Sequence, residues 1–152
     1  MSSNSRFTIS SVERSDFDKM VDLLRQLFSI EADFNVDPDK QRRGLELLQE
    51  SESAEIFVVR NDNQGVVAMA TLQLVVSTAE GGLVAWLEDL VVDTDHRGQG
   101  IGELLLSHIN QWLENRGVKR VQLVADRDNR LALDFYKKQG WQEINLNVLR
   151  RK

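Results

Sequence analysis

Three glycines at alternate positions distinguish the turn Arg97-Gly98-Gln99-Gly100-Ile101-Gly102. An entirely apolar stretch, Leu90-Val91-Val92, precedes the turn, and a helix-like pattern begins within it. A chain that passes from a buried strand into a helix presents several unpaired amide donors at one point, and the helix dipole adds partial positive charge there. Because glycine has no Cβ, an anion can approach these amides closely, and Arg97 can add a charge-assisted contact. The turn therefore predicts a phosphate-binding site.

The spacing of the turn excludes two common phosphate-binding loops. A dinucleotide fingerprint requires G-x-G-x-x-G, but its third glycine position holds Glu103 when counted from Gly98 and Leu105 when counted from Gly100. A Walker loop requires Gly-Lys followed by Ser or Thr, and the sequence has no such triplet. A turn that binds no ligand remains the alternative at this point.

Two adjacent carboxylates interrupt the apolar stretch that leads to the turn. A carboxylate in an apolar strand is costly to bury unless it is paired or used, and here Glu88 and Asp89 are neighbours. The period of two along a strand places Glu88 on one face with Leu90 and Val92, unless a bulge intervenes, and places Asp89 on the other. Alternatively, one or both carboxylates end in a solvated part of the sheet.

The N-terminal half of the chain is expected to contain two helices and a hairpin. Residues 7–9 alternate like a short strand, and Ser15 with Asp18 suggests a capping box before an amphipathic helix over residues 16–29. Pro38 favours the start of a second helix that runs to about residue 50. Residues 56–59 and 66–76 read as two strands of an antiparallel hairpin, and residues 84–92 as a third strand after a Gly-Gly break.

The C-terminal half continues with alternating helices and strands. A helix follows the glycine turn and ends at Gly117, residues 118–125 form a strand, residues 129–139 a helix and residues 141–149 a last strand. The resulting order is β-α-α-β-β-β-α-β-α-β. The change from hairpins to crossover helices predicts an α/β (α+β) fold, in which helices cover both faces of a mixed sheet.

Bulk composition limits the function classes. The 152 residues fit a single domain, 1–152, and 41% hydrophobic with 28% charged residues is typical of a soluble globular protein. No apolar run approaches the roughly 20 residues that cross a bilayer, and the N-terminus lacks the apolar stretch of a signal peptide. A cytoplasmic location is therefore expected.

The net charge of −5 disfavours nucleic acid or an anionic membrane as a partner. The absence of cysteine excludes a thiolate nucleophile, and neither His96 nor His108 has a partner at metal-ligand spacing, so no metal is expected.

Two blocks resemble one known family. Arg97-x-x-Gly100-x-Gly102 is similar to the acetyl-CoA signature Q/R-x-x-G-x-G/A of the GNAT N-acetyltransferase superfamily. Asn129-x-x-Ala132-x-x-x-Tyr136-x-x-x-Gly140-Trp141 resembles that family's second conserved block, and the order of elements resembles its fold. The resemblance implies one GNAT-like domain, in which the sheet splays apart between the fourth and fifth strands and acetyl-CoA is the co-substrate.

The resemblance also implies roles for particular residues. In this family the pantetheine arm of the cofactor pairs with the backbone of the fourth strand, here Leu90, Val91 and Val92. The amides of the turn hold the pyrophosphate, an Asn contacts the cofactor, and a Tyr protonates the departing thiolate. The residues expected to bind acetyl-CoA are thus Leu90, Val91, Val92, Arg97, Gly98, Gln99, Gly100, Ile101, Gly102, Glu103, Asn129 and Tyr136. Glu103 is expected to point outward, because its carboxylate would compete with phosphate for the same amides.

The acceptor side follows from the chemistry of amines. An alkyl ammonium has a pKa near 10, so a base helps to remove its proton before it attacks the thioester. Glu88 is the first candidate for this base and Asp89 the second, with Tyr136 as the acid. The resemblance implies that the segment after the first helix borders the acceptor cleft, and the residues expected to line the acceptor site are Glu31, Asp33, Phe34, Trp86 and Asp89. A solvated loop remains the alternative for residues 29–34.

The sequence leaves the acceptor open. A polyamine, an amino acid, an aminoglycoside, an aminoalkylphosphonate and a protein N-terminus are all compatible with it, and a small-molecule amine is favoured. The competing hypotheses are a catalytically idle module that binds acyl-CoA, an enzyme that acetylates a protein amine, and a regulator that binds a nucleotide. Homodimers are common in the family, but no sequence feature establishes one here.

Overall fold

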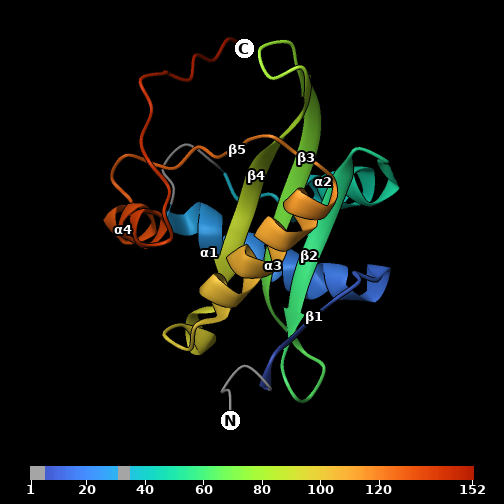
Figure 1. Ribbon diagram of the computed structural model, residues 1–152. Helices are drawn as coiled ribbons and strands as arrows, with labels where there is room; N and C mark the ends of the chain where they lie inside the picture. The colour runs from blue at the N-terminus through green and yellow to red at the C-terminus, as the bar shows by residue number, and fades with distance from the viewer. Residues whose placement is uncertain (1–5, 31–34) are drawn as a thin grey trace.

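The computed structural model describes residues 6–30 and 35–152. It consists of a five-stranded sheet with helices on both faces (Figure 1). The elements, in chain order, are β1 (Thr8–Ser10), α1 (Phe17–Ile30), α2 (Pro38–Glu50), β2 (Ala54–Arg60), β3 (Val66–Ser77), β4 (Gly82–Val92), α3 (Ile101–Asn115), β5 (Val121–Gln122) and α4 (Arg130–Lys138). Short 3-10 turns, η2 (Arg14–Asp16) and η3 (Thr94–His96), precede α1 and follow β4.

The sheet has the strand order β1-β2-β3-β4-β5 and is antiparallel except at one edge. β2 and β3 form the predicted hairpin, in which Val58 pairs with Met69. The Asn61 side chain closes the turn between them by accepting the Gly65 N–H at 2.9 Å. β4 pairs antiparallel with β3 and parallel with β5. The predicted mixed α/β sheet is therefore confirmed.

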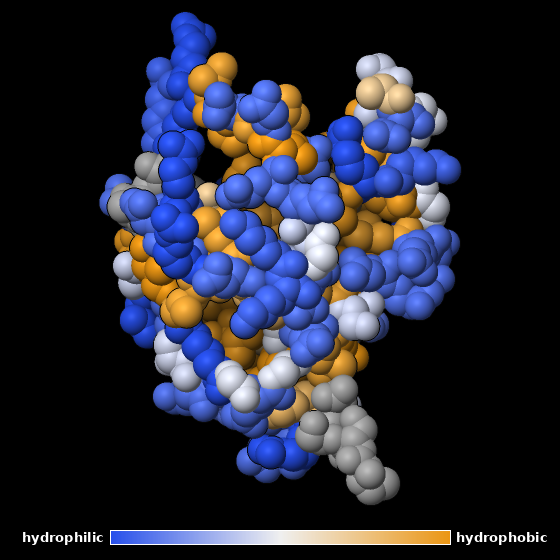
Figure 2. Space-filling view, turned by 60° about the vertical axis from the view of Figure 1, so that its left-hand side comes forward, coloured by the Kyte–Doolittle hydropathy of each residue, from blue (hydrophilic) through white to orange (hydrophobic). Residues whose placement is uncertain are grey.

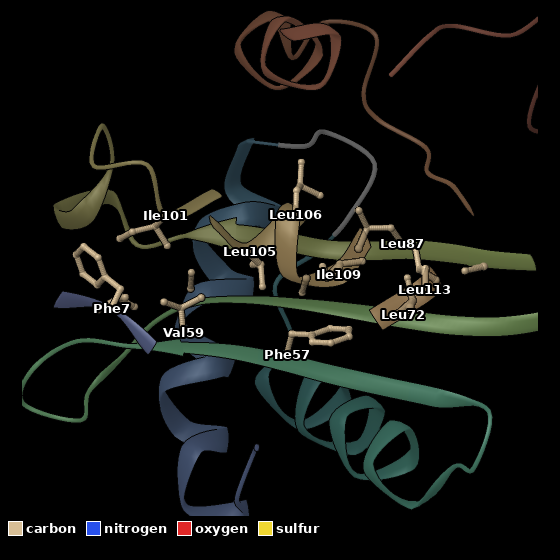
Figure 3. Close-up of a cluster of buried hydrophobic side chains, with 14 residues drawn as sticks. Phe7, Phe57, Val59, Leu72, Leu87, Ile101, Leu105, Leu106, Ile109 and Leu113 are labelled. Atoms are coloured by element: carbon tan, nitrogen blue, oxygen red, sulfur yellow. The ribbon is translucent and has the colours of Figure 1, made fainter. Parts of the chain in front are cut away.

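Two hydrophobic clusters pack against opposite faces of the sheet. On one face, α3 buries Ile101, Leu105, Ile109 and Leu113 against β2, β3 and β4, whereas Leu106 of the same cluster points away from these strands (Figure 3). On the other face, α1 and α2 bury Phe17, Met20, Leu23, Leu24 and Leu45 against Val58, Met69 and Val91. We call these the α3 face and the α1/α2 face. Successive side chains of a strand alternate between them.

The first helix begins differently from the prediction. The η2 turn precedes α1, and the backbone N–H of Glu13, rather than a cap at Ser15, donates to the Asp16 carboxylate at 2.8 Å. Asp16 in turn forms an ion pair with Arg60 of β2. The second helix begins as predicted, because Asp37 accepts the Lys40 N–H and Pro38 occupies the first helical position.

The predicted last strand over residues 141–149 is not formed, and the predicted strand over 118–125 shortens to β5. β5 pairs with β4 at two positions, so it offers no long edge on which a further strand could form. The chain after α4 instead leaves its apolar side chains exposed, including Ile144, Leu146 and Val148. Figure 2 brings this side of the molecule forward and shows hydrophobic patches within a mainly hydrophilic surface. Within the described ranges, no helix combines the length and the apolar character needed to span a membrane.

Candidate active site

Gly98 and Gly100 shape the loop between β4 and α3. Their φ angles are 77° and 78°, in the left-handed region that glycine adopts without a steric penalty. The carbonyl of Gly100 accepts the N–H of Leu104 at 3.0 Å and so begins α3. A Cβ added at either glycine would meet nothing within 4 Å. The amides at the N-terminus of α3 therefore lie beside open space, as an anion site requires.

Gly102 has a different role from the other two glycines. A Cβ at this position would lie 3.0 Å from Cζ of Phe135 on α4. The absence of a side chain therefore allows α3 and α4 to approach each other. Sequence reasoning assigned all three glycines to phosphate approach, and it missed this packing contact because Phe135 is distant in the chain.

A cavity of about 670 Å³ lies against the glycine loop. Glu103 is exposed, as expected, but it also lines this cavity. Arg97 extends back toward β4, where its Nε donates to the carbonyl of Val92 at 3.4 Å. The lining residues are Arg6, Phe7, Gly98, Gln99, Gly100, Glu103, Leu104 and Ser107.

The edge of β4 is open next to this loop. The last β4–β5 pair is Trp86 with Gln122, whereas β4 continues to Val92. After β5 the chain turns away from the sheet toward α4 (Figure 1). In the described part of the chain, Leu90, Val91 and Val92 therefore have no strand partner on the β5 side. The predicted splay between the fourth and fifth strands is present.

A β-bulge interrupts β4 opposite β3. Thr71 pairs with Glu88 and Met69 with Val91, so Asp89 and Leu90 together lie opposite the single residue Ala70. Asp89 has a φ of 55°, which is unusual for a residue with a side chain. The bulge changes the alternation of side chains between the two faces.

The bulge corrects the predicted orientation of the carboxylates. Glu88 lies on the α1/α2 face, directly across from Thr71, whereas Leu90 and Val92 pack against the α3 face cluster. The expected common face of Glu88, Leu90 and Val92 is therefore wrong. Asp89 was expected to face away from Glu88, yet its Oδ2 accepts a hydrogen bond from Thr71 Oγ1 at 2.8 Å. Both carboxylates consequently lie on the α1/α2 face.

The two carboxyl groups differ in their access to solvent. Glu88 is the more exposed of the two but is still partly buried, and Asp89 is of intermediate exposure. Partial burial, followed by the negative charge of Asp89, raises the pKa of Glu88. Burial raises the pKa of Asp89, and the hydrogen bond from Thr71 opposes that rise. The pair can therefore hold a proton at a higher pH than two solvated carboxylates.

A buried aspartate fixes the chain between β4 and the glycine loop. Asp93 is 6% exposed and accepts from Lys19 Nζ at 2.7 Å, while its backbone N–H donates to Val67. Burial opposes the charge of Asp93, but Lys19 and the N–H of Asp95 outweigh it and lower its pKa. Sequence reasoning missed this residue, although an Asp directly after an apolar strand is a signal for such an anchor.

The structure places Asn129 and Tyr136 at opposite ends of α4. Asn129 caps the helix by accepting the Ala132 N–H at 3.2 Å, and it lines a second cavity of about 280 Å³ with Ile30. The Tyr136 ring packs edge-to-face on Trp141, with centroids 5.6 Å apart, and contacts the cluster on the α3 face. Asn129 is thus not among the residues that line the cavity at the glycine loop.

The structure describes part of the predicted acceptor side. Trp86 is of intermediate exposure, and the alternation of β4 before the bulge places it on the same face as Glu88. Glu31, Asp33 and Phe34 lie outside the described residues. Within ranges 6–30 and 35–152, no group of three or more His, Cys, Asp or Glu side chains is arranged to hold a metal ion.

Comparison with known proteins identifies one family. Residues 18–141 match the acetyltransferase (GNAT) family. An uncharacterized N-acetyltransferase of Methanocaldococcus jannaschii is 27% identical over 138 residues, which cover 90% of this chain and 61% of that protein. A thialysine N-epsilon-acetyltransferase of Bos taurus is 31% identical over 93 residues, which cover 60% of this chain and 54% of that protein.

A solved structure shares the fold over almost its whole length. It is described as a possible acetyltransferase from Clostridium difficile 630, and it superposes with a TM-score of 0.85 at 19% identity, covering 97% of each chain. The chain spans less than two thirds of the length of the first curated relatives that it matches.

Proposed function

The chain belongs to the acetyltransferase (GNAT) family, and from this premise we propose that it transfers the acetyl group of acetyl-CoA to the primary amine of a small molecule. The observation that carries the proposal is the open edge of β4 beside the glycine loop. The strand continues to Val92 after its pairing with β5 has ended at Trp86. An extended chain with amide groups, such as pantetheine, can pair with such an edge.

The residues around this edge suit the other parts of acetyl-CoA. The amides from Gln99 to Glu103 at the start of α3 would hold the pyrophosphate, because they combine free donors with the positive end of the helix dipole. The cavity of about 670 Å³ beside them gives room for the remainder of the nucleotide. Arg97, which borders the loop, adds a positive charge.

Glu88 and Tyr136 would perform the proton transfers. Glu88 accepts a proton from the substrate ammonium, directly or through water, so that the neutral nitrogen attacks the thioester carbonyl. Tyr136 gives its phenolic proton to the sulfur as the carbon–sulfur bond breaks. The nitrogen releases a second proton to solvent as the amide bond forms, and Tyr136 regains a proton from solvent after it has protonated the sulfur. Backbone N–H groups of β4 would stabilise the developing oxyanion. The products are an N-acetylated amine and CoA with a free thiol.

The acidic pair on the α1/α2 face supports an acceptor that carries positive charge. Glu88 and Asp89 lie together on this face, and Trp86 adds an apolar surface. A small-molecule amine is also supported by the Bos taurus relative, whose name describes acetylation at the ε-nitrogen of thialysine.

Thiol release from acetyl-CoA, measured over a panel of amines, tests the proposal. The panel contains diamines and polyamines, amino acids, aminoglycosides, aminoalkylphosphonates and a peptide with a free N-terminus. We expect turnover with at least one small amine. CoA binding without turnover across the panel would instead favour an idle acyl-CoA module, and turnover of the peptide alone would favour a protein acceptor. A melting temperature raised by ATP or NAD but not by CoA would contradict the proposed cofactor.

A further inference from the structure

The bulge in β4 is held by a residue of the neighbouring strand. Asp89 is one of two residues with a side chain and a positive φ in the described part of the chain, the other being Gln64 in a surface turn. A residue keeps such a backbone conformation when its surroundings specify it. The surroundings of Asp89 include Thr71, which is 1% exposed and lies directly across from Glu88.

Thr71 contacts both acidic residues through one hydroxyl group. Its Oγ1 lies 2.8 Å from Oδ2 of Asp89 and 3.3 Å from the backbone carbonyl of Glu88. A hydroxyl has a single proton to donate, and the shorter distance favours the Asp89 carboxylate as the acceptor. The hydrogen bond therefore holds the carboxylate of the bulge on the face that carries Glu88.

We propose that Thr71 is a positioning residue for the acceptor side: its hydroxyl holds the Asp89 carboxylate beside Glu88, and so orients the pair that receives the amine. This inference rests on the proposed function, because it concerns the residues that would bind and deprotonate the acceptor. Thr71 itself donates no proton to the substrate. It acts through Asp89.

The charges around the pair indicate how this role can be measured. β3 and β5, which flank β4, carry no charged residue. α3 packs on the opposite face. The charged residues of α1 pair elsewhere: Asp18 with Arg42, Lys19 with Asp93, and Asp22 with Arg25. Burial is the largest influence on the pKa of both carboxyl groups. Among the described side chains, the charge of Asp89 then raises the pKa of Glu88, and the hydrogen bond from Thr71 lowers the pKa of Asp89.

Thr71→Val removes the hydroxyl with little change of shape, and Thr71→Ser retains it. The valine variant should raise the pKa of the Asp89 carboxyl group, because burial remains and the hydrogen bond is lost. With Asp89 protonated over a wider range of pH, the pKa of Glu88 should fall, and the acidic limb of kcat/KM should move to lower pH. We also expect kcat/KM at its plateau to fall roughly tenfold, which corresponds to the loss of one hydrogen bond, without a change in CoA affinity.

Carboxyl ¹³C NMR titration of the full chain measures the two pKa values directly and does not depend on turnover. The serine variant should titrate like the wild type, and Thr8→Val on exposed β1 controls for a threonine-to-valine change in a strand. Melting temperatures verify that each variant is folded. An unchanged titration of Asp89 in folded Thr71→Val would overturn the inference, as would a serine variant that behaves like valine. Absence of turnover by the wild type on every amine would overturn the proposed function instead, and the titration would still decide whether Thr71 positions the pair.

Discussion

Gly102 at the start of α3 faces the ring of Phe135 on α4 so closely that an added Cβ would lie 3.0 Å from Cζ. This contact connects the glycine loop to α4, which also carries Tyr136, the residue directly after Phe135. The helix α4 has no buried residue of its own, so a small displacement at this contact is expected to move it.

Gly102→Val should therefore disturb both folding and cofactor binding. The added methyl groups have to displace the Phe135 ring, and overpacking of this kind costs about 1–3 kcal/mol. We expect a lower melting temperature and a weaker Kd for CoA. Gly44→Val is the matched control, because Gly44 is also helical and a Cβ there meets nothing within 4 Å. If the melting temperature of Gly102→Val were equal to or higher than that of Gly44→Val, the packing role of Gly102 would be contradicted.

Gly100→Asp should weaken acetyl-CoA binding more than it weakens folding. It places a carboxylate where the pyrophosphate is proposed to bind, and it strains a backbone with a φ of 78°. Gly81→Asp separates the two effects, since Gly81 has a φ of 68° and open surroundings in the distant β3–β4 turn. Both variants should lose about 1–3 kcal/mol of stability, but only Gly100→Asp should raise the Kd measured by calorimetry. Equal affinities of the two variants for acetyl-CoA would show that the glycine loop does not bind the cofactor.

Glu88→Gln should lower kcat/KM by about 10²-fold or more, the usual contribution of a general base. Glu88 must lose its proton to act, and partial burial and the Asp89 charge raise its pKa. The wild-type rate should accordingly fall as the pH drops through a value above that of an ordinary glutamate, and this limb should be absent in the variant. The same acceptor is used for both proteins, so that its own ionisation cancels. Glu52→Gln, in an exposed turn, should retain the wild-type profile, and retention of the acidic limb by Glu88→Gln would assign it to another group.

The local sequence pattern predicted most of the helices and strands, but it did not predict which of their side chains contact one another at the candidate site. The apolar run before the glycine turn predicted β4, and Gly117 with a φ of 69° ends α3 as expected. Period-two alternation cannot reveal an extra residue in a strand, so it placed Asp89 on the wrong face. The hydrogen bond from Thr71 to Asp89 joins residues 18 positions apart in the chain, and the hydrogen bond from Lys19 to Asp93 joins residues 74 positions apart. Such contacts exist only once the sheet has formed.

The same limit explains the missing last strand. Ile144, Leu146 and Val148 alternate with polar residues as in a strand. Alternation describes how a segment could bury one face, but a strand also requires a neighbouring edge with free backbone groups. β5, with its two residues, does not provide that edge.

Tyr136→Phe should lower kcat while leaving the affinity for CoA nearly unchanged. The variant keeps the ring that packs against Phe135 and Trp141 and removes only the hydroxyl proposed to protonate the thiolate. Loss of a general acid reduces the rate by about 10²-fold or more. Single-turnover kinetics should show the loss in the chemical step, and the melting temperature should stay close to that of the wild type. An unaltered single-turnover rate would remove Tyr136 as the acid.

Asp16 and Arg60 form the ion pair that joins the start of α1 to the end of β2, and it should make stability depend on pH. Two hydrogen bonds of 2.8 and 2.7 Å connect their side chains, which are 10% and 12% exposed. Hydrogen bonds from Arg60 lower the pKa of Asp16 below its ordinary value. The pKa of Asp16 is therefore lower in the folded protein than in the unfolded chain. The ion pair contributes its full stability above the unfolded pKa of about 3.9, and this stability is lost as the pH falls through the lower, folded pKa.

Asp16→Asn should therefore destabilise the protein by about 3 kcal/mol at pH 7, because it leaves a mostly buried guanidinium without its counter-charge. The difference from the wild type, measured by urea denaturation, should begin to shrink as the pH drops below about 4, where Asp16 of the unfolded chain takes up a proton. It should disappear only below the lower pKa that Arg60 gives Asp16 in the folded protein. Asp22→Asn is the control: its partner Arg25 is 54% exposed, and such surface pairs contribute less than about 1 kcal/mol. If Asp16→Asn lost no more stability than Asp22→Asn, or if its deficit were equal at pH 3 and pH 7, the ion pair would not hold α1 against the sheet.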